Sequence, residues 1–186
     1  MVRFPDKVET ERLLLRLPVS RDARKFYKAV NESLPELRQW MPWAVEPYDL
    51  GKARSFCEVA TKNAEDGDDY SVVIVTKSRR RIVGCCSLKA RDWAVPRFEI
   101  GYWLRTGAVG NGFATEAARA LTELAFRSLA AERVEIRVDD LNARSYAIPE
   151  RLGFEWEATL RAHERATNGE LSNTRIYAMW SLSRLT

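Results

Sequence analysis

The chain of 186 residues is 46% hydrophobic and 30% charged, with a formal net charge of +4. Its length suits a single domain over residues 1–186, and its composition is typical of a soluble globular protein. No apolar run approaches the ~20 residues needed to span a membrane, and the segment 1–7 lacks the apolar stretch of a signal peptide. These features argue against a membrane protein or a secreted one, and the dispersed positive charge argues against a nucleic-acid-binding protein.

The first half of the chain predicts one strand, three helices and a hairpin. Apolar periodicity and capping residues place a strand at 10–17, a helix from the N-cap Ser20 to Val30, a short helix from Ser33 that carries Trp40, and a helix from the N-cap Asp49 to Ala64. Apolar runs then indicate strands at 70–76 and 81–88. The tight basic run 79–81 falls at the tip of this hairpin, where a solvated turn explains it better than a nucleic-acid patch does.

The three cysteines do not form the pattern of a disulfide framework or a metal site. Cys85 and Cys86 are adjacent in a predicted strand, so their side chains face opposite sides, and Cys57 lies in a predicted helix. Cysteines of this kind suit the core of a protein in a reducing compartment. We therefore expect a cytoplasmic protein that needs no metal.

The most informative segment is a Gly-rich turn between a strand and a helix. The apolar run 98–104 predicts the strand, and the segment 105–112 leads into an amphipathic helix with apolar residues at Ala117, Leu121 and Leu124. Glycines let a backbone approach an anion closely, and the unpaired first N–H groups of a helix attract negative charge together with its macrodipole. The turn therefore predicts a binding site for a phosphorylated ligand.

Three strands and one helix complete the chain. They are a strand at 134–138, a helix from the N-cap Asn142 to Gly153, and strands near 154–163 and 173–182. The order of elements predicts a mixed α/β domain whose strands begin in an antiparallel arrangement.

Two common phosphate-binding motifs do not fit the Gly-rich turn. A P-loop places Lys and then Ser or Thr after its last glycine, where this chain has Phe113 and Ala114. A dinucleotide-binding fold needs a third glycine and repeated parallel strand–helix units. Here Gly110 and Gly112 are followed by Thr115, and the strands before them are antiparallel.

The segment 110–117, Gly-Asn-Gly-Phe-Ala-Thr-Glu-Ala, resembles the acetyl-CoA pyrophosphate loop of the GNAT family of N-acetyltransferases. The segment 142–154, with Asn at its start and Gly-Phe at its end, resembles a later helix of the same family. The segments 99–104, 40–43 and 168–178 are similar to the RimJ/RimL branch, which acetylates the N-termini of ribosomal proteins. One departure is Val109, where the wider family prefers Gln or Arg.

The resemblance implies an α/β (α+β) fold with a mixed, mostly antiparallel seven-stranded sheet, flanked by helices and splayed between strands four and five. It implies acetyl-CoA as co-substrate and direct attack of an amine on the thioester in a ternary complex. The residues implied for cofactor binding are Tyr102, Trp103, Leu104, Val109, Gly110, Asn111, Gly112, Phe113, Ala114, Thr115 and Asn142.

The resemblance also implies two catalytic residues. Ser145 matches the serine that protonates the leaving thiolate in the RimL-like branch, whereas the tyrosine used by other members is replaced by Pro149. Pro149 removes the helical hydrogen bond to the carbonyl of residue 145, which predicts a kink beside Ser145. Glu164 matches a glutamate proposed as the base. The alternatives are a first-turn serine bonded to backbone and a solvated strand-end carboxylate.

Three further residues are assigned to the acceptor side. Trp40 and Trp43 would line the slot for the acceptor, with aromatic packing against the core as the alternative. Glu135 is a second candidate base, and His163, the single histidine, is expected at a strand edge rather than in catalysis.

The leading acceptor is the α-amine of a protein or peptide. The alternatives are a small amine, such as a polyamine, an amino acid or an antibiotic, and a catalytically inactive acetyl-CoA-binding module. Neither a membrane nor a nucleic acid is expected as a partner, and a homodimer is compatible with the sequence.

Overall fold

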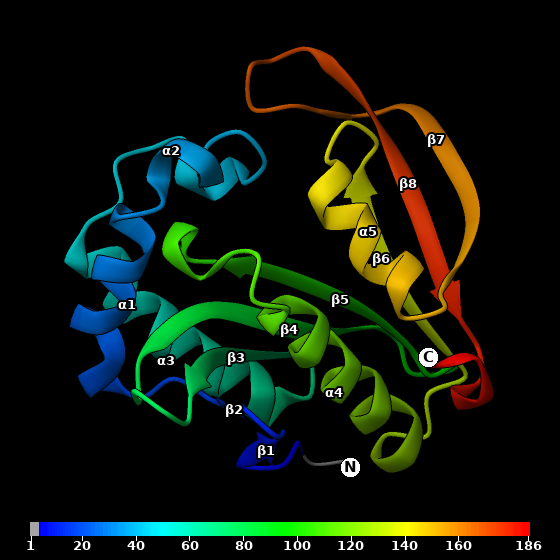
Figure 1. Cartoon of the computed structure of the whole chain (residues 1–186), viewed down its shortest axis with the longest axis horizontal. Helices are drawn as coiled ribbons and strands as arrows, with labels where there is room; N and C mark the ends of the chain where they lie inside the picture. Colours follow the sequence, from blue (N-terminus) through cyan, green and yellow to red (C-terminus); the bar gives the residue numbers. More distant parts are fainter. Residues whose placement is uncertain (1–3) are drawn as a thin grey trace.

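The computed structural model describes residues 4–186, which form a central β-sheet with helices on both faces (Figure 1). Residues 1–3, the start of the segment without signal-peptide features, lie outside the described residues. The strands are β1 (Lys7–Glu9), β2 (Leu13–Arg16), β3 (Asp69–Thr76), β4 (Ile82–Asp92), β5 (Arg97–Leu104), β6 (Arg133–Asp139), β7 (Glu155–Arg165) and β8 (Leu171–Met179). The helices are α1 (Ala23–Asn31), α2 (Leu34–Leu37), α3 (Leu50–Asp66), α4 (Phe113–Ser128) and α5 (Ala143–Arg151). No helix within residues 4–186 is long and apolar enough to cross a membrane.

The strands of the described chain are ordered β1-β2-β3-β4-β5-β6-β8-β7. Every neighbouring pair is antiparallel except β5 and β6, which are parallel. This confirms the mixed, mostly antiparallel sheet predicted from the sequence. The sheet has eight strands rather than the seven predicted, because β1 pairs with β2 at one edge although its three residues are too few to show strand periodicity.

Strands β5 and β6 pair only at their first residues and then separate. The register joins Arg97 to Arg133 and Glu99 to Glu135, and over the rest of the described strands β5 pairs only with β4 and β6 only with β8. The predicted splay is therefore confirmed, between the fourth and fifth strands when β2 is counted as the first.

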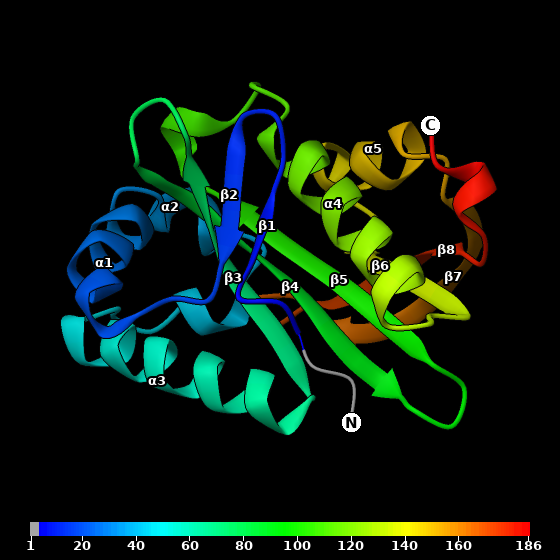
Figure 2. The same ribbon diagram turned by 90° about the horizontal axis from the view of Figure 1, so that it is seen from below.

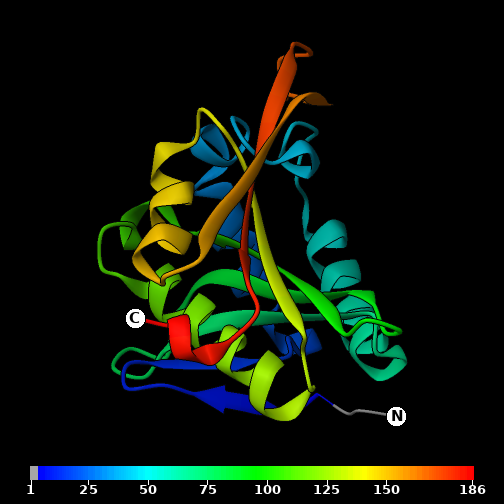
Figure 3. The ribbon, with the colours of Figure 1, turned by 90° about the vertical axis from the view of Figure 1, so that its right-hand side faces the viewer.

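The described residues form two hydrophobic clusters, and α3 and α4 lie on opposite faces of the sheet (Figure 2; Figure 3). The cluster on the α4 and α5 side contains Phe98 and Cys86, and the cluster on the α1 and α3 side contains Trp103 and Cys85. The two adjacent cysteines thus face opposite sides of β4, as predicted. All three thiols in the chain are buried and free.

Two of the predicted helix caps are present and one is not. Asp49 Oδ1 accepts a hydrogen bond from Lys52 N at 2.8 Å, and Asn142 Oδ1 accepts one from Ser145 N at 3.2 Å. The prediction that Ser20 caps a helix is wrong, because residues 20–22 form a 3-10 turn and α1 begins only afterwards. The buried carboxylate of Asp22, rather than the serine hydroxyl, accepts a hydrogen bond there, from the backbone N–H of Val19.

Candidate active site

The Gly-rich turn joins β5 to α4 and leaves backbone N–H groups open at the start of the helix. Gly110 and Gly112 have φ angles of 84° and 76°, in the left-handed region that glycine enters without strain. The first hydrogen bond of α4 runs from Glu116 N to Gly112 O at 3.0 Å, so the amides of residues 113–115 have no acceptor within the helix. These amides are donors of the kind that bind phosphate.

A cleft of about 1420 Å³ lies between this turn, α5 and the β1–β2 turn. The predicted cofactor residues that line it are Leu104, Val109, Gly110, Gly112, Phe113, Ala114 and Thr115. Asn111 is not among the lining residues, because its side-chain amide donates to the carbonyl of Ala108 at 3.1 Å within the turn. We call this space the first cleft.

Several charged side chains of the first cleft were missed by sequence reasoning. Four arginines line it, namely Arg12, Arg119, Arg144 and Arg151. Arg151 donates to the Thr115 hydroxyl at 3.2 Å, which places a cation beside the turn. Four glutamates line the cleft as well, and Glu116 is paired with Arg12 at 2.6 Å. Arginines from other elements therefore lie near the turn, whereas Val109, at the position where the wider family prefers Gln or Arg, supplies no charge.

Residues 102–104 belong to the part of β5 that has separated from β6. The Tyr102 hydroxyl bonds to α5, whereas Trp103 is buried on the other face, edge-on to Phe26 with ring centroids 5.5 Å apart. Trp103 can therefore meet a ligand in the splay only through its backbone.

The first turn of α5 places Asn142 and Ser145 at the opening between β5 and β6. The helix is continuous across Pro149, which leaves the carbonyl of Ser145 without the donor of a regular helical hydrogen bond, and the kink beside Ser145 stays a prediction. The hydroxyl of Tyr102 donates to this carbonyl of Ser145 at 2.9 Å. The Ser145 hydroxyl oxygen lies 3.5 Å from the Tyr102 hydroxyl oxygen.

A second cleft, of about 300 Å³, lies at the splay. Five predicted site residues line it, namely Trp40, Tyr102, Asn142, Ser145 and Glu164. Asn142 in this second cleft is followed directly in the chain by Ala143, which lines the first cleft. Both clefts therefore reach the N-terminus of α5.

The structure separates the two tryptophans that were predicted to act together. Trp40 lies beyond the end of α2, not within the helix predicted to carry it, and it lines the second cleft. Trp43 packs instead against Tyr48 and Trp103, with ring centroids 5.7 Å and 6.1 Å away. The arrangement favours an acceptor contact for Trp40 and the alternative role, packing, for Trp43.

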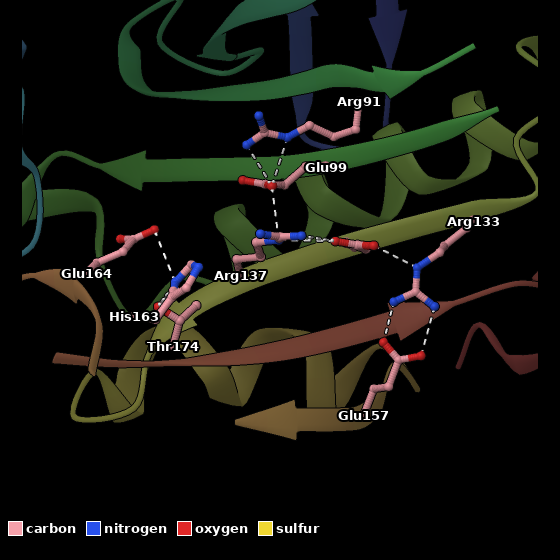
Figure 4. A network of polar contacts seen from close by, with 9 residues as sticks. Arg91, Glu99, Arg133, Arg137, Glu157, His163, Glu164 and Thr174 are labelled. Atoms are coloured by element: carbon pink, nitrogen blue, oxygen red, sulfur yellow. Dashed lines mark hydrogen bonds and ion pairs between the residues drawn. The ribbon is translucent and has the colours of Figure 1, made fainter. Parts of the chain in front are cut away.

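Glu164 reaches the second cleft from an irregular part of β7. The register of β7 with β8 shifts between Leu160 and Glu164, and Ala162 has a φ of 49°. Such a bulge redirects the side chains that follow it. His163 Nδ1 lies 3.0 Å from the hydroxyl of Thr174 and 3.6 Å from Glu164 Oε1 (Figure 4). Glu164 lines the cleft, and His163 does not.

Glu135 is buried on β6 and forms ion pairs with two arginines. Its Oε1 accepts from Arg133 Nε at 2.7 Å and its Oε2 accepts from Arg137 Nε at 3.1 Å. Burial alone raises the pKa of Glu135, but the hydrogen bonds from both arginines outweigh it and hold the pKa below the ordinary 4.5. Glu135 lines neither cleft. The arrangement favours a structural carboxylate over a base or an acceptor contact.

A chain of ion pairs continues from this carboxylate to the second cleft and was missed by sequence reasoning (Figure 4). Arg137 lies 3.4 Å from Glu99, which accepts two hydrogen bonds from Arg91 at 3.0 and 2.8 Å. All three side chains line the second cleft. The signal was present in β6, where every second residue from Arg133 to Asp139 is charged, a pattern that indicates one polar sheet face.

Residues 12–155 match the acetyltransferase (GNAT) domain family. The chain is also 30% identical over 171 residues to the uncharacterized N-acetyltransferase p20 of Bacillus licheniformis, which covers 91% of this chain and 93% of that protein. The chain therefore belongs to the GNAT family. It is an N-acetyltransferase that uses acetyl-CoA, as the resemblance of its turn and its later helix implied.

Two solved structures show the same fold over nearly the whole chain. The microcin C7 self-immunity acetyltransferase MccE, in complex with acetyl-CoA and AMP, has a TM-score of 0.89 and 24% identity, covering 96% of this chain and 98% of MccE. RimL, a ribosomal L7/L12 α-N-protein acetyltransferase in complex with coenzyme A, has a TM-score of 0.88 and 20% identity, covering 95% and 99%. These likenesses confirm the predicted GNAT fold, and RimL is among the proteins that share it.

Proposed function

We propose that this acetyltransferase acetylates the α-amine of a protein or peptide, with Ser145 and Glu164 moving the protons. The observation that carries the proposal is that both clefts reach the N-terminus of α5, where Asn142 lines one and the adjacent Ala143 lines the other. One cleft suits a phosphorylated co-substrate, and the other brings a hydroxyl and a carboxylate to the same opening. This is the arrangement that a ternary complex requires.

The first cleft fits the pyrophosphate of acetyl-CoA. The amides of residues 113–115 supply unpaired donors, and Arg151 stands beside Thr115. A Cβ added to Gly110 would meet no protein atom within 4 Å, so the backbone of the turn is open to a close approach. The separated stretch 102–104 of β5 leaves backbone groups toward the splay for the pantetheine arm, opposite Asn142.

The second cleft would hold the acceptor. Glu164 would accept the proton of the acceptor ammonium, and this role is supported by a side chain that lines the cleft and is 66% exposed. Ser145 lies in the same cleft and would donate its hydroxyl proton to the leaving thiolate. Acetyl-CoA supplies the thioester that the amine attacks.

A peptide acceptor is supported by the walls of the second cleft. One wall is the segment 39–42 with Trp40, and the other is the segment 164–167 of the β7–β8 hairpin. The two walls touch where the Thr167 hydroxyl donates to the carbonyl of Gln39 at 3.2 Å. RimL, which has the same fold, is an α-N-protein acetyltransferase. Two such chain segments can flank an extended N-terminus on both sides.

The acceptor class is tested by the release of coenzyme A thiol from acetyl-CoA. The panel contains short peptides with a free α-amine, the same peptides with a blocked α-amine and one lysine, and polyamines, free amino acids and amine-bearing antibiotics. We expect turnover with the free α-amines. Turnover confined to small amines contradicts the proposal, and binding of acetyl-CoA without turnover on any amine supports an inactive binding module instead.

The two catalytic roles are tested by Ser145→Ala and Glu164→Gln on the best peptide of that panel. Each should lower kcat by about tenfold to a hundredfold while the KM for acetyl-CoA stays near that of the parent. Glu170→Gln removes a carboxylate from the same hairpin outside both clefts and serves as the control. A kcat that the two variants leave unchanged contradicts the assigned roles.

A further inference from the structure

Pro149 leaves one carbonyl of α5 without its helical donor, and a residue from another element takes the place of that donor. A proline has no N–H, so the carbonyl four residues earlier, that of Ser145, cannot accept the regular i→i−4 hydrogen bond of the helix. The hydroxyl of Tyr102 donates to this carbonyl at 2.9 Å. A half-buried carbonyl that has lost its regular helical donor thus binds a side chain from β5.

This hydrogen bond crosses the opening between the two sides of the site. Tyr102 lies on β5 beyond its last pair with β6, and Ser145 lies in the first turn of α5, which follows β6. Both residues line the second cleft. The Tyr102–Ser145 bond therefore joins β5 to α5 at the second cleft.

The same hydroxyl also stands next to the reactive group of Ser145. The Ser145 hydroxyl oxygen lies 3.5 Å from the Tyr102 hydroxyl oxygen. Because the proton of Tyr102 is directed to the carbonyl, its oxygen is left as an acceptor for the Ser145 proton. Burial raises the pKa of Tyr102, so the tyrosine stays protonated and the bond to the carbonyl persists.

We infer that Tyr102 is a positioning residue for Ser145: its hydroxyl binds the carbonyl that Pro149 frees and holds the Ser145 hydroxyl at the opening between β5 and β6. This inference rests on the proposed role of Ser145 as proton donor. Tyr102 takes no part in proton transfer itself. It limits the orientations of the serine hydroxyl before the thiolate forms.

The variants Tyr102→Phe and Pro149→Ala distinguish two possible roles of the Tyr102 hydroxyl. One is to orient the Ser145 hydroxyl, and the other is only to supply a hydrogen-bond donor to the Ser145 carbonyl. Tyr102→Phe removes one hydroxyl and keeps the ring, and Pro149→Ala restores a backbone N–H that can bond the carbonyl of Ser145. We expect Tyr102→Phe to lower kcat by about fivefold and to lower the Tm, with the KM for acetyl-CoA unchanged. The double variant should regain the Tm but not kcat, because the backbone donor cannot hold the serine hydroxyl.

Three results would overturn the inference: an unchanged kcat in Tyr102→Phe, recovery of kcat together with the Tm in the double variant, or a full effect of Tyr102→Phe in a Ser145→Ala background. The last comparison also separates the two proposals. A full kcat in Ser145→Ala contradicts the proposed function, whereas a lowered kcat there with an unchanged kcat in Tyr102→Phe contradicts only the role of Tyr102.

Crystal structures of the parent and of Tyr102→Phe give a readout that needs no acceptor. We expect one Ser145 rotamer in the parent and more than one in the variant. One identical rotamer in both structures would also overturn the inference.

Discussion

The guanidinium of Arg12 binds the carboxylate of Glu116, 104 residues further along the chain, with Nε 2.6 Å from Oε2. The backbone N–H of Arg12 donates to the same carboxylate at 2.9 Å. Arg12 also donates to the carbonyl of Asn111 at 2.9 Å and lies over the ring of Phe113, 4.9 Å from its centroid. This pair fastens the Gly-rich turn to the chain before β2, and it orients the amides that we assign to phosphate.

Weakening this pair should therefore affect acetyl-CoA binding more than the chemical step. Glu116→Gln keeps the shape of the side chain but removes its charge, so the turn loses its strongest anchor. We expect the KM for acetyl-CoA to rise by about tenfold with kcat near the parent value. Because Arg12 is half exposed, the loss of stability should be only about 1 kcal/mol, or a fall in Tm of about 2–4 °C.

The control for this prediction is Glu123→Gln, which removes a charge from the same cleft at another place on α4. Glu123→Gln should leave the KM for acetyl-CoA and kcat close to those of the parent. Equal KM values in the two variants would show that the charge of the cleft matters, and not the anchoring of the turn.

Glu135 makes the stability of the fold depend on pH. Its folded-state pKa lies below 4.5, so its contribution is complete above the unfolded-state pKa and is lost as pH falls through the folded-state pKa. Glu135→Gln removes the charge that pairs with Arg133 and Arg137, which should cost about 2 kcal/mol at neutral pH. The difference from the parent should shrink on acidification below pH 4.5, as urea unfolding at a series of pH values would show.

The same variant distinguishes a structural carboxylate from a base. Glu135→Gln should keep most of kcat under conditions where it stays folded. Glu157→Gln, which removes the exposed partner of Arg133, should cost less stability and serves as the control. A hundredfold fall in kcat of a folded Glu135→Gln variant would contradict the structural role and support Glu135 as the base.

Trp40 and Trp43 should respond in opposite ways to truncation. Trp40→Ala removes a wall of the second cleft, so we expect a higher KM for the peptide acceptor and a small change in Tm. Trp43→Ala removes aromatic contacts with Trp103 and Tyr48, so we expect a loss of about 2 kcal/mol and a smaller effect on the acceptor KM. Each variant is the control for the other, and identical profiles would contradict the division of roles.

Helix α5 illustrates what could be predicted from the sequence. The Asn142 cap and the end at Gly153, which has a φ of 82°, follow from local backbone rules, and both are present. The buried Phe154 after that glycine follows from the same motif. The freed carbonyl before Pro149 is also a local consequence of residue chemistry. Such features need no knowledge of the rest of the chain.

The partners of these local features could not be predicted in the same way. The donor to the Ser145 carbonyl comes from Tyr102, 43 residues earlier, and no local pattern connects the two. The charges of β6 indicate a polar face, but their pairing with Glu99 and Arg91 depends on how β4, β5 and β6 lie side by side. Tertiary packing decides such contacts, because it brings together strands that are separated by α4 in the sequence.

Gly110 and Gly169 offer a matched test of the proposed phosphate contact. Both have positive φ angles, 84° and 87°, and a Cβ at either position would meet no protein atom within 4 Å. An alanine at either site should therefore cost a similar amount, about 1–2 kcal/mol, for the left-handed backbone alone. Only Gly110 lines the first cleft, where the added methyl group would enter the space assigned to the pyrophosphate.

We therefore expect Gly110→Ala to weaken acetyl-CoA binding by at least about tenfold in calorimetry, and Gly169→Ala to leave it unchanged. Chemical unfolding should show similar losses of stability in the two variants, so that the difference in binding cannot be attributed to backbone strain. Equal affinities of both variants for acetyl-CoA would remove the turn at Gly110 from the cofactor site.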